Sequence, residues 1–273
     1  MLLPYLVCAK PLGLLVWVLL LGLLPLAAQA AEPDRLTQIH ARGELRVCFW
    51  PLYYGMGFRN PKNGVVSGLD ADLAQNLAQE LKVRLRLVDS SFAQFIPDLL
   101  GDQCDIAMMA VAVTPQRADK VAFSRPYLRS DVYAVTTRNH TRVRNWADID
   151  QPGVRVAVVA GTTQETVMRE RLTQAQLVVI KPPQTREGEL EAGRVDVFMS
   201  DYPFTRKIMN NHDWTRVIAP STSYAPMSYA WAIKPGDPMW LHTINRFVAA
   251  IRADGRLART AQRHELTPIL ITD

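Results

Sequence analysis

Residues 104–127 read CDIAMMAVAVTPQRADKVAFSRPY, and this stretch indicates the fold class. The apolar run over 104–113 is predicted to be a buried strand. Thr114 is a favoured residue at a helix N-cap and Pro115 at the first helical position, so we expect a helix directly after the strand. A buried strand followed at once by a helix is typical of an α/β protein with a mostly parallel sheet.

The same alternation continues on both sides of this stretch. Leu73, Leu77 and Leu81 fall on one face of an amphipathic helix that is expected to begin at about Asp70. Further strands are expected at 45–50, 84–88, 132–137, 154–159, 177–180, 195–199 and 229–233, and further helices at 92–100, from 162, at 187–192 and at 238–263 with a break at Gly255. The alternation restarts near residue 137, which predicts a second α/β lobe.

The first thirty residues differ from the rest of the chain. Lys10 is the only charged residue before Glu32, residues 11–28 are apolar, and 28–30 have the A-x-A pattern of a secretory signal. We expect a signal peptide over 1–30, cleaved after Ala30, that exports the chain. The alternative is an uncleaved membrane anchor, because the apolar run is barely long enough to span a bilayer.

The composition is that of a globular protein, with 48% hydrophobic and 21% charged residues among 273. Cleavage would remove one of the 31 basic residues and none of the 26 acidic ones, which leaves a net charge of about +4. These charges are interspersed along the chain, so nucleic-acid binding is not expected. The five histidines show no metal-ligand spacing and no nucleotide-binding or nucleophile motif occurs, so no catalytic residue, metal or cofactor is predicted.

Two cysteines remain after the expected cleavage, Cys48 and Cys104. An exported protein meets an oxidising compartment, which favours a disulfide between them. Two buried thiols are the alternative, and the sequence leaves both open.

Three segments together carry a family resemblance: GLDADLA at 68–74, the stretch at 104–127, and VVAGTTQE at 158–165 followed by AGRVDVFMSD at 192–201. In this order and spacing, from about Leu45 to Leu266, the chain resembles the family 3 periplasmic solute-binding proteins. The resemblance implies a two-lobed periplasmic-binding-protein fold of type II, a Venus flytrap, in which each lobe is a mostly parallel sheet flanked by helices. It implies lobe 1 from 31–133 plus 229–273, lobe 2 from 137–226, and hinge crossings near 134–136 and 227–228.

Arg117 is the main candidate for binding a ligand. It lies at the third position after the predicted helix start, where free backbone N–H groups favour an anion, and its guanidinium can hold a carboxylate with two parallel hydrogen bonds. Thr162 and Glu165 have the spacing of a capping box, and Gly161 before them allows close approach of a ligand. The resemblance implies that Thr163 contacts the same carboxylate.

Asp201 ends a predicted buried strand, where a side chain faces the crevice of an open α/β sheet. The resemblance implies that it binds the α-ammonium group of a ligand; an N-cap for the following helix is the alternative. Tyr54 and Phe92 match family positions whose rings cover the ligand, and Trp50 is close to Tyr54 in the sequence.

Family members that bind amino acids usually have small polar residues just before the T-x-x-R segment, whereas residues 109–112 here are MAVA. Ala112 lacks a hydroxyl that would help to hold the carboxylate, while the backbone carbonyl near Ala110 can still accept from an ammonium group. The cleft is therefore expected to be more apolar than in a typical polar amino-acid receptor. An apolar or aromatic amino acid, or another small carboxylate, is the expected ligand.

The function implied by the resemblance is that of a periplasmic receptor of an ABC importer. Such a protein captures an amino acid or related small carboxylate between its lobes, delivers it to a permease in the inner membrane, and is expected to act as a monomer without a cofactor. The cysteine pair resembles a subgroup associated with periplasmic quinoprotein dehydrogenases, so a partner-associated or sensory role is the alternative. A periplasmic dehydratase on the same fold is a further alternative, and its general acid would be Glu165, which capping already explains.

Overall fold

The computed structural model describes Leu2 and residues 34–271. The expected signal peptide, 1–30, lies outside the described residues except for Leu2. The described chain from Asp34 onward forms one compact unit. None of its helices is both long enough and apolar enough to cross a membrane.

The first sheet has six strands in the order β5-β1-β6-β14-β7, with β8 also paired to β14. Its strands are β1 (Glu44–Phe49), β5 (Arg84–Asp89), β6 (Ile106–Ala112), β7 (Ala122–Phe123), β8 (Leu128–Ser130) and β14 (Met227–Ile233). β5, β1 and β6 run parallel, whereas β14 is antiparallel to each of its neighbours.

The second sheet has five strands in the order β11-β10-β12-β9-β13. Its strands are β9 (Val132–Thr137), β10 (Arg155–Val159), β11 (Gln176–Ile180), β12 (Val197–Asp201) and β13 (Thr215–Ile218). β11, β10 and β12 run parallel, and β9 is antiparallel to both β12 and β13. Both sheets are therefore mixed, with a parallel part built by βαβ units as the sequence predicted.

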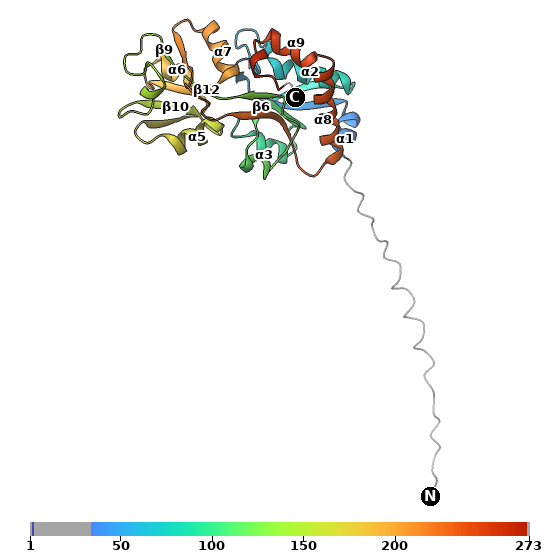
Figure 1. Cartoon of the computed structure of the whole chain (residues 1–273). Helices are drawn as coiled ribbons and strands as arrows, with labels where there is room; N and C mark the ends of the chain where they lie inside the picture. Colours follow the sequence, from blue (N-terminus) through green and yellow to red (C-terminus); the bar gives the residue numbers. More distant parts are fainter. Residues whose placement is uncertain (1, 3–33, 272–273) are drawn as a thin grey trace. The chain divides into compact units, whose positions relative to one another are not determined.

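Helices cover each sheet (Figure 1). The helices packed on strands of the first sheet are α1 (Arg35–Arg42), α2 (Leu69–Glu80) and α3 (Phe95–Leu100). α8 (Pro238–Ala253) packs on α1 and on α9 (Arg256–Arg263), α9 also packs on α2, and the short helix α4 (Pro115–Ala118) follows β6. The helices packed on the second sheet are α5 (Thr163–Arg171), α6 (Arg186–Glu191) and α7 (Tyr202–Asn211). The remaining elements are short: β2 (Leu52–Tyr53), β3 (Gly57–Arg59), β4 (Val66–Ser67) and the 3-10 turns Trp146–Asp148 and Thr267–Ile269.

Several local predictions are confirmed. Leu73 and Leu77 are buried on α2, and the side chain of Thr114 accepts a hydrogen bond from the backbone N–H of Arg117 at the start of α4. Gly255 separates α8 from α9 with a φ of +77°, a value that glycine adopts without strain. The expected strands and helices occur with shifts of a few residues at their ends.

The chain changes sheet at other residues than the sequence predicted. Residues 134–136 lie inside β9 of the second sheet, and 227–228 lie inside β14 of the first. The changes of sheet fall at Asp131 and between Ile218 and Met227. A segment that connects the two sheets and the strand that continues it have the same residue pattern. Only the pairing of strands in the structure shows where one ends and the other begins.

Cys48 in β1 forms a disulfide with Cys104, which comes just before β6. The two strands are neighbours in the first sheet, and both sulfurs are buried. The alternative of two free thiols is therefore excluded.

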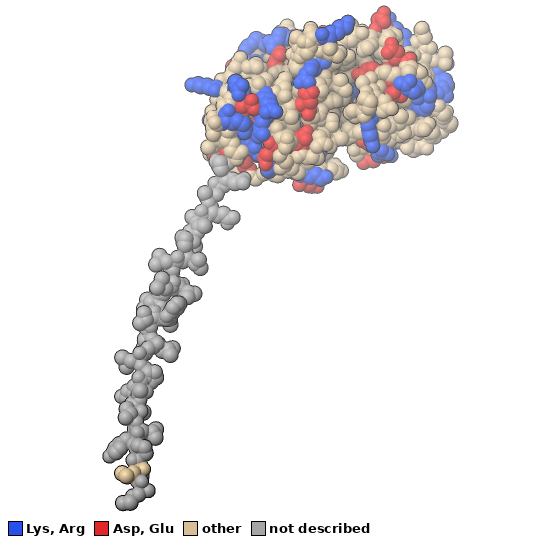
Figure 2. Space-filling model, turned by 180° about the vertical axis from the view of Figure 1, so that it is seen from behind, with Lys and Arg blue, Asp and Glu red and all other residues tan. Residues whose placement is uncertain are grey.

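Acidic and basic side chains lie among one another on the face shown in Figure 2. This matches the interspersed charges of the sequence. Within the described part of the chain, no cluster of His, Cys, Asp or Glu could hold a metal ion.

Candidate ligand-binding site

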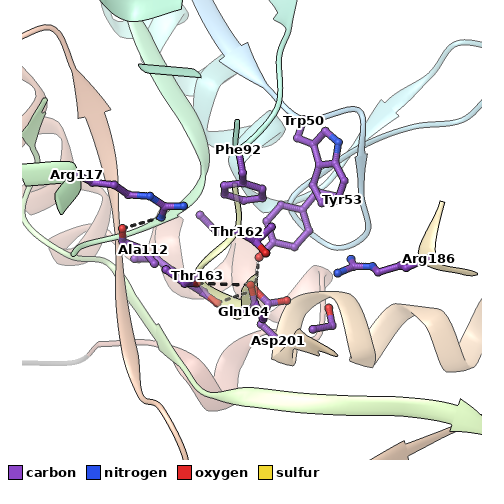
Figure 3. Close-up of a pocket in the computed structure, with 13 residues that line it drawn as sticks. Trp50, Tyr53, Phe92, Ala112, Arg117, Thr162, Thr163, Gln164, Arg186 and Asp201 are labelled. Carbon is purple, nitrogen blue, oxygen red and sulfur yellow. Dashed lines mark hydrogen bonds between the residues drawn. The ribbon is translucent and has the colours of Figure 1, made fainter. Parts of the chain in front are cut away.

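A small cavity lined by both polar and apolar side chains lies between the two sheets (Figure 3). It brings together seven residues that the sequence predicted for the site: Trp50, Phe92, Ala110, Ala112, Arg117, Thr163 and Asp201. Six further residues complete its lining: Tyr53, Thr162, Gln164, Arg186, Ser200 and Tyr229. The cavity therefore draws on both lobes, as an interlobe ligand site requires.

Arg117 reaches this cavity from the start of α4. Its Nη1 donates to the carbonyl oxygen of Ala112 and its Nη2 to that of Gly161, both at 2.9 Å. The side chain stacks near Phe92 and Phe95, with Cζ 5.7 and 5.5 Å from the ring centroids. Burial lowers the pKa of Arg117 to about 10, so the group remains charged at neutral pH.

Arg117 has no acidic partner among the described residues, although only 8% of it is exposed. A buried guanidinium is usually paired with an anion, and this one has more N–H donors than the two carbonyls accept. The geometry thus leaves donors for an incoming anion. Because Arg117 lies in the first lobe and Gly161 in the second, the same side chain also connects the lobes.

The N-terminus of α5 forms one wall. Thr162 is the N-cap, and its hydroxyl accepts from the backbone N–H of Glu165 at 3.3 Å and donates to the carbonyl oxygen of Val159 at 2.7 Å. Glu165 accepts from the N–H of Gly161 at 2.7 Å, one residue before the cap position that the sequence predicted. The hydroxyl of Thr163 contacts the sulfur of Met227 at 3.3 Å, a weak acceptor, and Oε1 of Gln164 at a long 3.5 Å.

Asp201 lies at the end of β12 and caps α7, since its side chain accepts from the backbone N–H of Phe204 at 3.3 Å. It also accepts from the hydroxyls of Tyr229, at 2.6 Å, and Tyr53. Burial raises the pKa of Asp201 above its ordinary value, and the hydrogen bonds from the two phenols act in the opposite direction. The N-cap interpretation is correct, and the carboxylate already serves three donors.

Three rings line the side of the cavity that belongs to the first lobe. The ring centroids of Trp50, Tyr53 and Phe92 are 5.5 to 5.8 Å apart. Such a cluster gives apolar cover to a bound molecule.

Tyr54 does not line this cavity, which corrects the sequence prediction. Its ring packs on Phe58 and Phe204, with centroids 4.4 and 5.2 Å away, and it borders a separate groove. Tyr53 ends β2 and takes the cavity position instead, whereas Tyr54 lies in the turn that follows. The sequence does not show which of two adjacent tyrosines faces the cavity, because that depends on where the strand ends and the turn begins.

Ala110 and Ala112 contribute the end of β6. Ala110 has a φ of +48°, and its backbone N–H donates to the buried carboxylate of Asp70 at 2.7 Å. The carbonyl of Ala112 is taken by Arg117. The small side chains keep this end of the cavity open.

Arg186 is the most important residue that the sequence did not predict. It begins α6 shortly after β11, and only 4% of it is exposed. The sequence did hold a signal for this residue: Arg186 comes shortly after a predicted strand, and ligands of open α/β sheets bind at the carboxyl ends of the strands. Its guanidinium carbon lies 3.6 Å from the ring centroid of Phe204.

The fold and this cavity define a two-lobed α/β protein with a candidate ligand site between the lobes. The chain belongs to the bacterial extracellular solute-binding proteins, family 3, whose family model matches residues 45–266.

Similar proteins include both an enzyme and binding proteins. Cyclohexadienyl dehydratase of Pseudomonas aeruginosa is 33% identical over 182 residues, covering 66% of this chain and 68% of that protein. L-cystine-binding protein TcyJ of Escherichia coli is 23% identical over 85% of this chain and 86% of its own length. The crystal structure of the ancestral amino-acid-binding protein AncCDT-1, a precursor of cyclohexadienyl dehydratase, matches with a TM-score of 0.76 at 30% identity, over 84% of this chain and 98% of that one.

Proposed function

We propose that this protein is a periplasmic solute-binding receptor of an ABC importer. It captures an amino acid or related small carboxylate between its lobes and delivers it to a permease in the inner membrane. The observation that carries the proposal is the buried Arg117, which has no acidic partner in the described part of the chain and lines the same cavity as Thr163. Membership of family 3 and the amino-acid-binding relatives support the same function.

In this proposal the ligand carboxylate binds Arg117 from lobe 1 and Thr163 from lobe 2, and an α-ammonium, where the ligand has one, lies near Asp201. Since these groups come from both lobes, a bound ligand favours the closed arrangement over the open one. The segments around Asp131 and between Ile218 and Met227 would form the hinge. The closed face would then dock on the permease.

The test is ligand binding by residues 31–273, measured by thermal shift and then by calorimetry. The panel contains the common amino acids, small carboxylates and polyamines. A carboxylate ligand should raise the melting temperature by mass action, and polyamines should not. Arg117→Met should weaken that ligand by at least about 30-fold, because one partner of a buried ion pair is lost.

Arg129→Met removes an exposed arginine of the same lobe and should leave affinity unchanged. Full carboxylate affinity in Arg117→Met would rule out the site. A folded protein that binds nothing in the panel would instead favour the partner-associated or sensory alternative.

A dehydratase is the second candidate, because an enzyme of that name is 33% identical. The acids near the cavity argue against it. Glu165 is held by the N–H of Gly161 and by Arg169 at 2.8 Å, and Asp201 accepts from three donors. Incubation of the protein with a cyclohexadienyl acid should therefore yield no dehydrated product. Accumulation of that product would overturn the receptor proposal.

A further inference from the structure

The guanidinium group of Arg186 is buried with most of its hydrogen-bonding capacity unused. Its Nη1 donates to the carbonyl oxygen of Met199 across a long 3.4 Å contact. Its Nε and Nη2 have no hydrogen-bond partner among the described residues. A buried donor without an acceptor is costly, so these nitrogen atoms indicate a missing partner.

The surroundings of Arg186 do not supply that partner. No carboxylate of the described chain lies within ion-pair distance of it. Aromatic rings surround it instead, with the centroids of Phe204, Phe198 and Trp50 at 3.6, 5.3 and 5.7 Å from Cζ. Contact with ring faces stabilises a cation but accepts no N–H in-plane, so the edge of the guanidinium stays unmatched.

Arg186 and Arg117 line the same cavity from different lobes. In Figure 3 they extend toward it from opposite sides, with Phe92 and Tyr53 between them. Asp201 is the only carboxylate among the lining residues that the structure describes, and Tyr53, Tyr229 and Phe204 already donate to it. Two guanidinium groups therefore face one carboxylate, and the cavity has an excess of positive charge.

We propose that Arg186 is a specificity-determining residue that binds a second carboxylate of the ligand, and that the ligand is a small molecule with two carboxylates. One carboxylate binds Arg117 and the other binds Arg186, whose planar fork suits bidentate binding. This rests on the proposed function, since it names the substrate class of the same site. The ligand is either an acidic amino acid or a dicarboxylate without an ammonium group, and the experiment separates the two.

The experiment compares acids with their amides by calorimetry on residues 31–273. The matched pairs are L-glutamate with L-glutamine, L-aspartate with L-asparagine, glutarate with glutaramate, and succinate with succinamate. Each amide has nearly the shape of its acid but lacks the second charge. At least one acid should bind at least about 30-fold more tightly than its amide, as expected for an ion pair lost from a buried site. Glutamate or aspartate should bind more tightly than glutarate or succinate only if the site also binds an ammonium group.

Arg186→Met should reduce the acid to the affinity of its amide and leave the amide unchanged. Arg186→Lys, which keeps the charge, should recover part of the preference. The control is Arg194→Met on the surface of the same lobe, where the arginine pairs with Glu189, and it should bind like the unmodified chain.

Each other outcome overturns a specific statement. If a neutral amino acid or an amide binds as well as the acids, the two-carboxylate ligand is wrong while the receptor function stands. If Arg186→Met lowers the melting temperature without ligand and weakens acids and amides equally, Arg186 is structural. If neither this panel nor the wider one binds, the proposed function fails together with the inference.

Discussion

At the scale of single residues, the buried carboxylate of Asp70 holds the strand end that lines the cavity, although it does not line the cavity itself. The carboxylate is fully buried and accepts from the indole of Trp231 at 2.9 Å, the hydroxyl of Tyr127 at 2.7 Å and the backbone N–H of Ala110 at 2.7 Å. These donors hold the end of β6 where Ala110 lines the site. Burial nevertheless dominates and raises the pKa of Asp70 to about 6.

This shift predicts a pH dependence of stability. Because the pKa in the folded state lies above the ordinary value of 3.8, the folded protein binds the proton more tightly. The associated stability is present below about pH 4 and is lost as the pH rises through about 6, on the order of 3 kcal/mol in all. Urea unfolding of the unmodified chain and of Asp70→Asn from pH 3.5 to 7 should show this fall in the difference between their free energies of unfolding, because the other carboxylates contribute equally to both.

Asp70→Asn should be less stable overall, because an amide opposes three donors, but its stability should lack this fall with rising pH. Asp213→Asn at an exposed position should keep it. Parallel pH profiles for the unmodified chain and Asp70→Asn would contradict the assignment.

At the scale of elements, the Cys48–Cys104 disulfide ties β1 to the start of β6 across a sequence separation of 56 residues. The enclosed segment contains the Trp50 and Phe92 walls of the cavity. The cross-link should stabilise the first lobe mainly by restricting the unfolded chain. A loop of this length predicts a contribution of about 4 kcal/mol.

Replacement of both cysteines by alanine should lower the free energy of unfolding by that amount, measured by urea denaturation. Reduction of the unmodified chain retains both sulfur atoms and should produce most of the same loss, which separates the cross-link from packing. Two titratable thiols in the unfolded, unmodified chain before any reductant is added would show that no disulfide forms.

At the scale of the whole molecule, glycines allow the two lobes to meet. A Cβ on Gly161 would lie 2.5 Å from the backbone nitrogen of Ala93, and a Cβ on Gly55 would lie 2.9 Å from the carbonyl oxygen of Pro203. Gly161 follows β10 of the second sheet and Ala93 follows β5 of the first, while Gly55 lies between β2 and β3 and Pro203 in α7 beside the second sheet. Overlaps with backbone atoms are not relieved by a side-chain rotation, so a methyl group there opposes closure.

Gly161→Ala should therefore weaken ligand binding by roughly tenfold or more, because the closed state becomes less populated. Gly193→Ala is the matched control, since it has a similar φ of +66° against +77° and no atom within 4 Å of the added Cβ. Both variants should lose about 1–2 kcal/mol of stability from the left-handed backbone. Equal affinities in the two variants would show that the approach of Gly161 to Ala93 does not limit closure.

The candidate site was predictable where a residue's role follows from its place on one element. Arg117 at the start of α4, Thr162 at the cap of α5 and Asp201 at the end of β12 all follow from local patterns. Tyr53 and Arg186 were missed, because their positions depend on where a strand ends and on which loop meets the opposite lobe.

The sequence by itself determined the α/β class, the start of α4 at Thr114, the buried face of α2 and the break at Gly255, because these depend on a few neighbouring residues. The tertiary structure decided the rest: the disulfide, the residues at which the chain changes sheet, and the meeting of Arg117 with Arg186 in one cavity. These features arise only when distant segments pack together. No local spacing encodes which donors remain unpaired after the two lobes meet.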